Sequence, residues 1–102
     1  MIIIIGSITI RDETLDEALR ISQEHVNRSR IEAGCINHGV HIDNEDPNRL
    51  VFVERWESME QLEQLEQHFQ VTESAEFAGK IAEMASVAPN MELYHSASIQ
   101  RH

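Results

Sequence analysis

The amino-acid sequence predicts an α+β domain in which strands and helices follow the order β-α-β-β-α-β, with the second helix split in two. Three observations predict this class. Four segments show the apolar runs or two-residue alternation of β-strands, and the segments between them repeat apolar residues at helical spacing. Glycine, proline and asparagine stand at the junctions, where turns and helix ends favour them.

The first strand and the first helix are expected in the N-terminal third. Residues 2–10 are rich in isoleucine and end in alternation, which is typical of a strand buried on at least one face. Thr14, with Glu17 three residues later, predicts a capping box at the start of a helix. This helix is expected to run to about Ala33, and Gly34 is expected to end it in the left-handed conformation.

The middle of the chain predicts a β-hairpin. Residues 35–43 alternate, residues 49–57 have a second strand pattern, and residues 44–48 contain the Asp, Pro and Asn that favour turns. Ser58 with Gln61 predicts the start of the next helix.

The C-terminal part predicts the rest of the split helix and a last strand. Residues 70–74 interrupt the helical pattern, and a further helix is expected over about 74–87. Residues 89–90, Pro-Asn, are expected to end it, and 91–99 to form the fourth strand. This order is that of the ferredoxin-like split β-α-β arrangement with a four-stranded antiparallel sheet, and we interpret residues 1–102 as a single domain of this type.

The strands are apolar on both of their faces. In the first strand, Ile2, Ile4 and Ile8 lie on one face, whereas Ile3 and Ile5 lie on the other. Helices on one side of the sheet would cover only one of these faces. The simplest cover for the other is a second copy of the chain, so we expect a homodimer that packs its sheets face to face.

The charge and the cysteine content exclude some classes of partner and site. The chain has 102 residues and 18 acidic against 8 basic side chains, and its net charge of −10 disfavours nucleic acid and anionic membrane surfaces. Cys35 is the single cysteine, so neither an intrachain disulfide nor a thiolate zinc cluster can form. The start MIIIIG lacks the basic region and the length of a signal peptide, and we expect a cytoplasmic protein.

Several short motifs resemble those of the antibiotic biosynthesis monooxygenase family. The residues 32–35, EAGC, precede a strand, and Phe52-x-Glu54-x-Trp56 closes the next one. His68 on the following helix precedes TESAEF at 72–77. These pieces are spread over nearly the whole chain, and their combination is more specific than any one of them.

The resemblance implies a fold, a partner and an activity. Members of the family are dimers of ferredoxin-like units, with a pocket between each sheet and its helices. Oxygenase members oxidise quinols, anthrones or similar phenols with molecular oxygen and typically use no metal, flavin or haem. This chemistry is possible because the substrate anion can itself give an electron to oxygen, while the protein promotes deprotonation and excludes water.

The resemblance also indicates candidate site residues. Either His25 or His68 would be the catalytic base, since a neutral imidazole is a suitable base for a phenol. The candidates for substrate binding are the expected pocket walls His38, Phe52, Trp56 and Phe69. No metal site is expected, because His38 and His41 point to opposite faces of a strand and no H-E-x-x-H motif is present.

The chain departs from some members of the family. Haem-degrading relatives carry an Asn in the first strand and a His in the last helix, where this chain offers Gly6, Ser7 and Ile81, so haem is not expected. Some oxygenases place an Asn four residues before the Trp, where this chain has Phe52. Two alternatives to an oxygenase stay open. One is an isomerase of a small hydroxycarbonyl compound with a helix histidine like His25, and the other is a non-catalytic, ligand-binding dimeric module.

Overall fold

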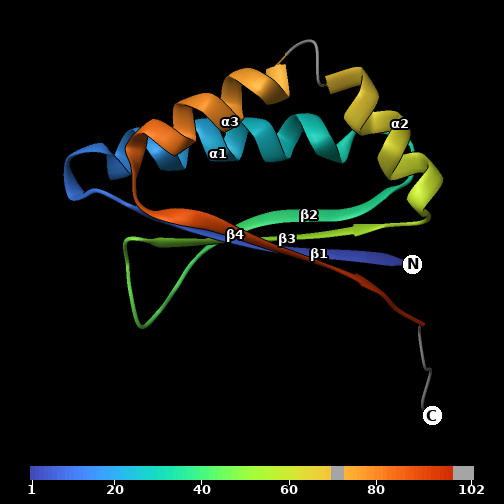
Figure 1. Cartoon of the computed structure of the whole chain (residues 1–102), viewed down its shortest axis with the longest axis horizontal. Helices are drawn as coiled ribbons and strands as arrows, with labels where there is room; N and C mark the ends of the chain where they lie inside the picture. Colours follow the sequence, from blue (N-terminus) through green and yellow to red (C-terminus); the bar gives the residue numbers. More distant parts are fainter. Residues whose placement is uncertain (70–72, 98–102) are drawn as a thin grey trace.

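The computed structural model of the chain describes residues 1–69 and 73–97, without the side chains of 65–74. Figure 1 shows strands and helices in the expected order. They are β1 (Ile2–Ile10), the short 3-10 helix η1 (Asp12–Thr14), α1 (Leu15–Arg30), β2 (Cys35–Ile42), β3 (Arg49–Trp56), α2 (Met59–Phe69), α3 (Glu73–Met84) and β4 (Ala85–His95). None of the helices in the described residues is long and apolar enough to cross a membrane.

The four strands form one antiparallel sheet in the order β2-β3-β1-β4, and the three helices lie over one of its faces (Figure 1). The predicted ferredoxin-like α+β fold with its hairpin is therefore confirmed, and the second helix is divided into α2 and α3. Of the interruption predicted at 70–74, residues 70–72 lie outside the described residues, and α3 already begins at Glu73. The hairpin turn also follows the prediction, because β2 ends at Ile42 and β3 begins at Arg49. At the start of α2, the Ser58 hydroxyl accepts a hydrogen bond from the Gln61 backbone N–H at 3.2 Å, as the sequence indicated.

The predicted ends of the first helix are wrong in two details. Thr14 precedes α1 but makes no capping bond, because its hydroxyl donates instead to the carbonyl oxygens of Arg11 and Met84, at 3.1 and 3.4 Å. The helix ends at Arg30 rather than about Ala33. Gly34 does adopt a left-handed conformation, with φ of 86°, but it stands in the turn before β2 and not directly at the helix end.

The boundary between the last helix and the last strand is also corrected. The helix ends at Met84 instead of running to 87, and β4 begins at once with Ala85. The last strand was predicted over 91–99 but ends at His95, and residues 98 and 99 lie outside the described part of the chain. The backbone N–H of Arg11 donates to the Met84 carbonyl at 2.9 Å, and its guanidinium donates to the Glu83 carbonyl at 2.6 Å. Pro89 lies inside β4, which tolerates it because β4 is an edge strand with an irregular register near this point.

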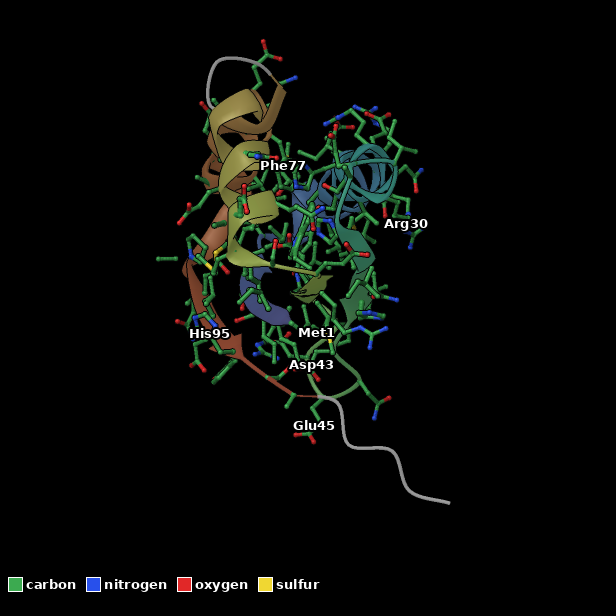
Figure 2. All side chains as sticks on the ribbon, turned by 90° about the vertical axis from the view of Figure 1, so that its right-hand side faces the viewer. Met1, Arg30, Asp43, Glu45, Phe77 and His95 are labelled. Atoms are coloured by element: carbon green, nitrogen blue, oxygen red, sulfur yellow. The ribbon has the colours of Figure 1, made fainter. Side chains whose placement is uncertain are left out.

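The core between the sheet and the helices consists of two separate clusters of buried side chains. The Trp56 cluster contains Ile2, Ile4, Trp56 and Leu62. The α1–α3 cluster contains Ile8, Ile10, Ala18, Ile21, Leu50 and Ile81. Figure 2 shows the side chains between the helices and the sheet, with Phe77 on the side of α3 that faces α1.

The other face of the sheet carries apolar side chains that no helix covers. Ile5 is 42% exposed, and the register places it opposite Val53 of β3. Ile3 lies opposite Tyr94 of β4, which is 44% exposed. The expected division of β1 into a covered and an uncovered apolar face is thus present in the structure.

Candidate functional site

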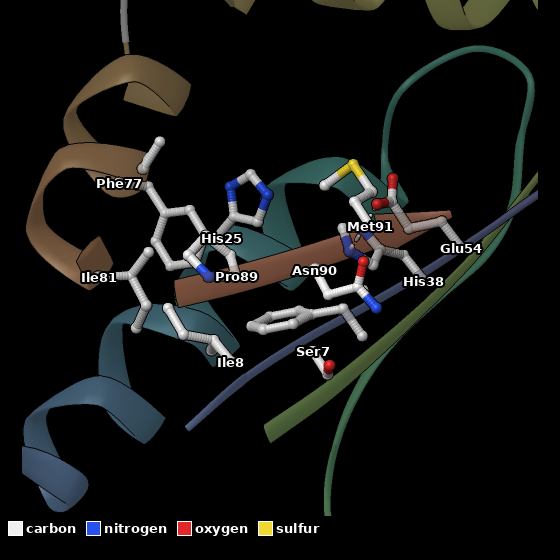
Figure 3. Close-up of a pocket in the computed structure, with 13 residues that line it drawn as sticks. Ser7, Ile8, His25, His38, Glu54, Phe77, Ile81, Pro89, Asn90 and Met91 are labelled. Carbon is white, nitrogen blue, oxygen red and sulfur yellow. Dashed lines mark ion pairs between the residues drawn. The ribbon is translucent and has the colours of Figure 1, made fainter. Parts of the chain in front are cut away.

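A pocket of about 200 Å³ lies between the two core clusters, under α1 and α3 and over β1, β3 and the middle of β4 (Figure 3). It is smaller than the about 300–1,000 Å³ of sites for drug-sized ligands. It exceeds the cavity of about 150 Å³ that is known to hold benzene. Its walls are Gly6, Ser7, Ile8, His25, His38, Phe52, Glu54, Phe77, Ala78, Ile81, Pro89, Asn90 and Met91.

The sheet supplies the floor of the pocket through two neighbouring rows of paired residues. In one row, Phe52 of β3 lies opposite Gly6 of β1, which lies opposite Met91 of β4. In the next row, His38 of β2 lies opposite Glu54 of β3. Directly opposed residues point to the same face of a sheet, so this register brings the phenyl ring, the imidazole and the carboxylate to the same side as the helices.

The helices supply the roof. His25 follows Ile21 by one helical turn on α1, and both belong to the face that packs on the sheet. Its imidazole stacks on the Phe77 ring of α3, with ring centroids 4.2 Å apart and planes at 3°. Figure 3 shows these two rings together, with Ile8 and Ser7 on the opposite side. Phe52 meets the Phe77 ring edge-on at 6.2 Å, so two phenyl rings border the space.

Both pocket histidines are neutral at pH 7. Burial lowers the pKa of His25 to about 4, with a smaller contribution from the positive charge of Arg28. Burial also lowers the pKa of His38 to about 4, and His25 and Arg30 act in the same direction. The two rings meet edge-on with centroids 5.6 Å apart. A neutral imidazole can accept a proton, so the pair can serve as a base in an apolar pocket.

Glu54 places a carboxylate beside this pair. Its Oε2 lies 3.9 Å from His38 Nε2, which is too long for a hydrogen bond. Its Oε1 accepts a hydrogen bond from the Trp56 indole N–H at 3.1 Å. The carboxylate is therefore held in a position where it would stabilise an imidazolium that forms during a proton transfer.

A second, charged hollow of about 130 Å³ lies on the outer side of Phe77, between α1 and α3. Its walls are Ile21, Glu24, Arg28, Glu76, Phe77 and Lys80. Among the side chains that the structure describes, no lysine or arginine lines the first pocket, and Phe77 separates it from the two cations of this hollow. The inner pocket therefore suits an uncharged ring better than a phosphorylated compound.

The candidate residues from the sequence fall into three groups. His25, His38 and Phe52 line the pocket. Trp56 is fully buried in the Trp56 cluster and is not among the walls, although it contacts the site through Glu54. His68 and Phe69 belong to α2, but their side chains lie outside the described part of the chain. The roles of all six remain predictions.

Among the walls that were not candidates from the sequence are Gly6, Phe77 and Met91. In the sequence, Phe77 is noted only as the last residue of the TESAEF motif. The interruption of an isoleucine-rich strand by Gly6 was a usable signal. Among the residues that the structure describes, no group of three or more His, Cys, Asp or Glu side chains is placed to hold a metal ion.

Comparison with known proteins relates the chain to one family. The family described as antibiotic biosynthesis monooxygenase matches residues 1–80. An uncharacterized Synechocystis protein is 27% identical over 99 residues, which are 97% of this chain and 65% of that protein, so the chain spans less than two thirds of this relative.

Solved structures share the fold across almost the whole chain. The crystal structure of an antibiotic biosynthesis monooxygenase superposes with a TM-score of 0.82 at 23% identity, over 96% of this chain and 100% of the other. A Deinococcus radiodurans protein that carries the same family name reaches 0.88 at 14% identity, over 100% and 98%. At these identities the structures establish the fold alone.

Proposed function

Because the chain belongs to the antibiotic biosynthesis monooxygenase family, we propose that it is a monooxygenase that oxidises a small aromatic, quinol-like compound with molecular oxygen and no cofactor. One observation carries this proposal. A neutral histidine, His25, stands in the wall of an apolar pocket that is bordered by the rings of Phe52 and Phe77. A phenol placed there would have a base at its hydroxyl and apolar walls around its ring.

The first chemical step is the removal of the phenolic proton. His25 takes this proton and becomes positively charged. The His25 ring contacts the His38 ring, and the Glu54 carboxylate, 3.9 Å from His38, stabilises this charge. The apolar walls disfavour water, so the phenolate is held without a hydration shell and its electrons are more available. His68 is the second candidate for the base, on the grounds of its motif alone.

The oxidation that follows balances without an external reductant. The phenolate gives one electron to oxygen, and the resulting radical and superoxide combine to form a carbon–oxygen bond. The peroxide takes up a proton, its O–O bond then breaks, and the carbon loses its hydrogen as a proton. One phenol and one O₂ thus give one quinone and one water. The substrate loses four electrons, one oxygen atom enters the product, and the other leaves as water.

A homodimer forms part of this proposal. The uncovered sheet face carries Ile3, Ile5, Val53 and Tyr94, and a second copy of the chain would bury them. Light scattering at micromolar concentration should then give twice the mass of the 11.7 kDa chain. Replacing Ile5 with Lys should shift the mass toward the monomer, whereas a wild-type mass near 11.7 kDa would rule out this part of the proposal.

The isomerase alternative is less well supported by the pocket. A phosphorylated hydroxyketone needs a cation near its phosphate, and Arg28 and Lys80 line the other hollow, beyond Phe77, and not this pocket. We therefore retain the oxygenase as the proposal.

The test is oxygen uptake with phenol, hydroquinone and catechol as substrates, compared with the same solutions without protein. We expect uptake of one O₂ per substrate, and with ¹⁸O₂ one labelled atom in the quinone and one in water. The matched variants His25→Gln and His68→Gln keep a polar side chain but remove the base. No uptake above the protein-free rate with any phenol or quinol would contradict the proposal.

A further inference from the structure

One wall of the pocket is a position on β1 that lacks a side chain. The helix-facing residues of β1 are Ile2, Ile4, Gly6, Ile8 and Ile10, and all four isoleucines are buried by at least 95%. Ile2 and Ile4 belong to the Trp56 cluster, while Ile8 and Ile10 belong to the α1–α3 cluster. Gly6 stands between them, and it is part of the pocket wall. A larger side chain at position 6 would therefore point toward the pocket and take up part of its volume.

The backbone does not require a glycine at this position. Gly34 is the one residue with a positive φ in the described part of the chain, so Gly6 has a conformation that any residue adopts. A Cβ atom at Gly6 would meet the Asn90 carbonyl oxygen at 3.6 Å, Met91 Cε at 3.9 Å and Phe52 Cβ at 4.0 Å. These are ordinary van der Waals distances, so packing would accept an alanine.

A glycine inside a strand also weakens the strand. It loses more conformational freedom on folding than other residues do and offers no side chain to pack. Neither strain nor close packing explains Gly6, and its local effect on stability is unfavourable. The remaining structural consequence is the empty space above its Cα, between Phe52 on one side and Met91 on the other.

The size and shape of this space indicate what would fill it. A volume of about 200 Å³ is enough for one six-membered ring with one or two small substituents, because about 150 Å³ holds benzene. The rings of Phe52 and Phe77 border it. The polar groups stand at its margin, with His38 and Glu54 from one row of the sheet and Asn90 from β4.

We propose that Gly6 sets the size limit of the ligand site, and that the ligand is a single-ring phenol or hydroquinone whose ring lies over Gly6. This inference rests on the proposed function for the identity of the chemistry, but it concerns binding and is testable without turnover. It excludes fused two- and three-ring phenols as good ligands.

The test is the affinity of the full chain for phenol and for 2-naphthol, which adds one fused ring, measured by calorimetric titration under nitrogen. The wild type should bind phenol at least about tenfold more tightly than 2-naphthol. Gly6→Ala should weaken phenol binding by about tenfold and Gly6→Val by about a hundredfold or more, since one methyl group in a ligand site is worth about 10–200-fold.

Gly79→Ala is the matched control. Gly79 lies on α3 with nothing within 4 Å of its Cβ position, and it is not part of the pocket wall. This variant should bind phenol as the wild type does. Both alanine variants should melt at or above the wild-type temperature, because each replaces a glycine in a regular element. A loss of affinity in Gly6→Ala alone would therefore reflect lost space and not lost folding.

Three results would overturn the inference: no phenol binding by the wild type, equal affinity for 2-naphthol and phenol, or unchanged phenol affinity in Gly6→Ala. If Gly6→Val does not fold, Gly6→Ala decides. The proposed function fails separately. Phenol binding that is lost in the Gly6 variants without any oxygen uptake would retain the size limit and reject the oxygenase. Oxygen uptake that is equal in the wild type and in Gly6→Val would retain the oxygenase and reject the size limit.

Discussion

The two ends of the helix-covered sheet face are closed, whereas its middle is open. At the closed end, Trp56 packs on Ile2, Ile4 and Leu62 and has no exposed surface. Two pairs further along the same face of the two strands, Phe52 lies opposite Gly6 and both face a cavity. The strands, their pairing and their alternation are the same in the two places. What differs is the volume of the side chain on β1.

Along the pair β1–β3, the closed end contributes to folding stability, whereas the open middle contains the residues of the candidate site. The closed end buries the largest side chain of the chain and contributes free energy of folding. The open middle gathers two neutral histidines, which are costly to bury, around a void that contributes nothing to packing. Substitutions at the closed end should therefore change folding, and those in the middle should change activity.

The largest expected effect comes from truncation at the closed end. Trp56→Ala should lower the free energy of unfolding by about 3–5 kcal/mol, as for other buried tryptophans. Phe52→Ala should cost about 1–2 kcal/mol, because Phe52 is only partly buried and already borders a cavity. Urea denaturation at pH 7 measures both. Equal costs for the two variants would contradict the division into a closed end and an open middle.

The next effect is a dependence of stability on pH that comes from the open middle. The pKa of His25 and of His38 is lowered to about 4, below the ordinary value near 6.5 that applies in the unfolded chain. Between these values the unfolded state binds more protons than the folded state. The contribution of these two neutral histidines to the free energy of unfolding is therefore fully present above about pH 6.5, and it is lost as the pH falls toward 4.

From pH 7 to pH 5, we expect the two histidines together to cost about 2–4 kcal/mol of unfolding free energy. The double variant His25→Gln/His38→Gln removes both titrating groups. Between pH 7 and pH 5 its unfolding free energy should fall by about 2–4 kcal/mol less than that of the wild type. Urea denaturation of both proteins at pH 7 and pH 5 measures the difference. Because the carboxylates elsewhere in the chain are unchanged, their contribution is the same in both proteins. Equal losses would show that the histidines are not buried as neutral groups.

The fold could be predicted from the sequence because its signals are local. Isoleucine alternation in β1, the Asp-Pro-Asn turn and the Ser58 cap each act within a few residues. The end of α3 could not be predicted in this way. Its last carbonyl groups are bound by Arg11 and Thr14, more than 60 residues away in sequence, and β1 then pairs with Ala85. Tertiary contacts thus overrode the local helical pattern.

The site was less accessible to prediction for a related reason. The alternation of side chains along a strand assigns Phe52, Glu54 and Trp56 to one face of β3. It does not say which of these side chains packs in a core cluster and which borders a cavity. The outcome depends on the opposite residue of β1, which is Ile2 for Trp56 and Gly6 for Phe52. Trp56 therefore belongs to a closed cluster, and Phe52 to the pocket.

A third effect concerns the base. His25→Gln should lower kcat/KM by about a hundredfold or more, because the phenol must then lose its proton to water. The unfolding free energy at pH 7 should fall by only about 1 kcal/mol, because the glutamine cannot stack on the Phe77 ring as the imidazole does. His68→Gln is the parallel variant. Full activity in both variants would mean that the substrate anion forms unaided, and a loss in His68→Gln alone would assign the base to α2.

The smallest effect is expected at Glu54, which acts through the histidines. Glu54→Gln keeps an oxygen that can accept the Trp56 indole N–H but removes the charge 3.9 Å from His38. We expect kcat/KM to fall by about tenfold, which corresponds to about 1.4 kcal/mol of lost transition-state stabilisation. Removing a negative charge also disfavours the imidazolium, so the acidic limb of the pH profile should move to lower pH.

That shift distinguishes an electrostatic role of Glu54 from a structural one. A variant that merely disturbed the pocket would lower the rate at every pH without moving the limb. Glu57→Gln is the matched control, since Glu57 is an exposed carboxylate just beyond the end of β3 and is not part of the pocket wall. It should leave both the rate and the limb unchanged. If Glu54→Gln lowers activity but the limb stays in place, the carboxylate only positions Trp56 and His38, and the charge of the protonated base is stabilised by other groups.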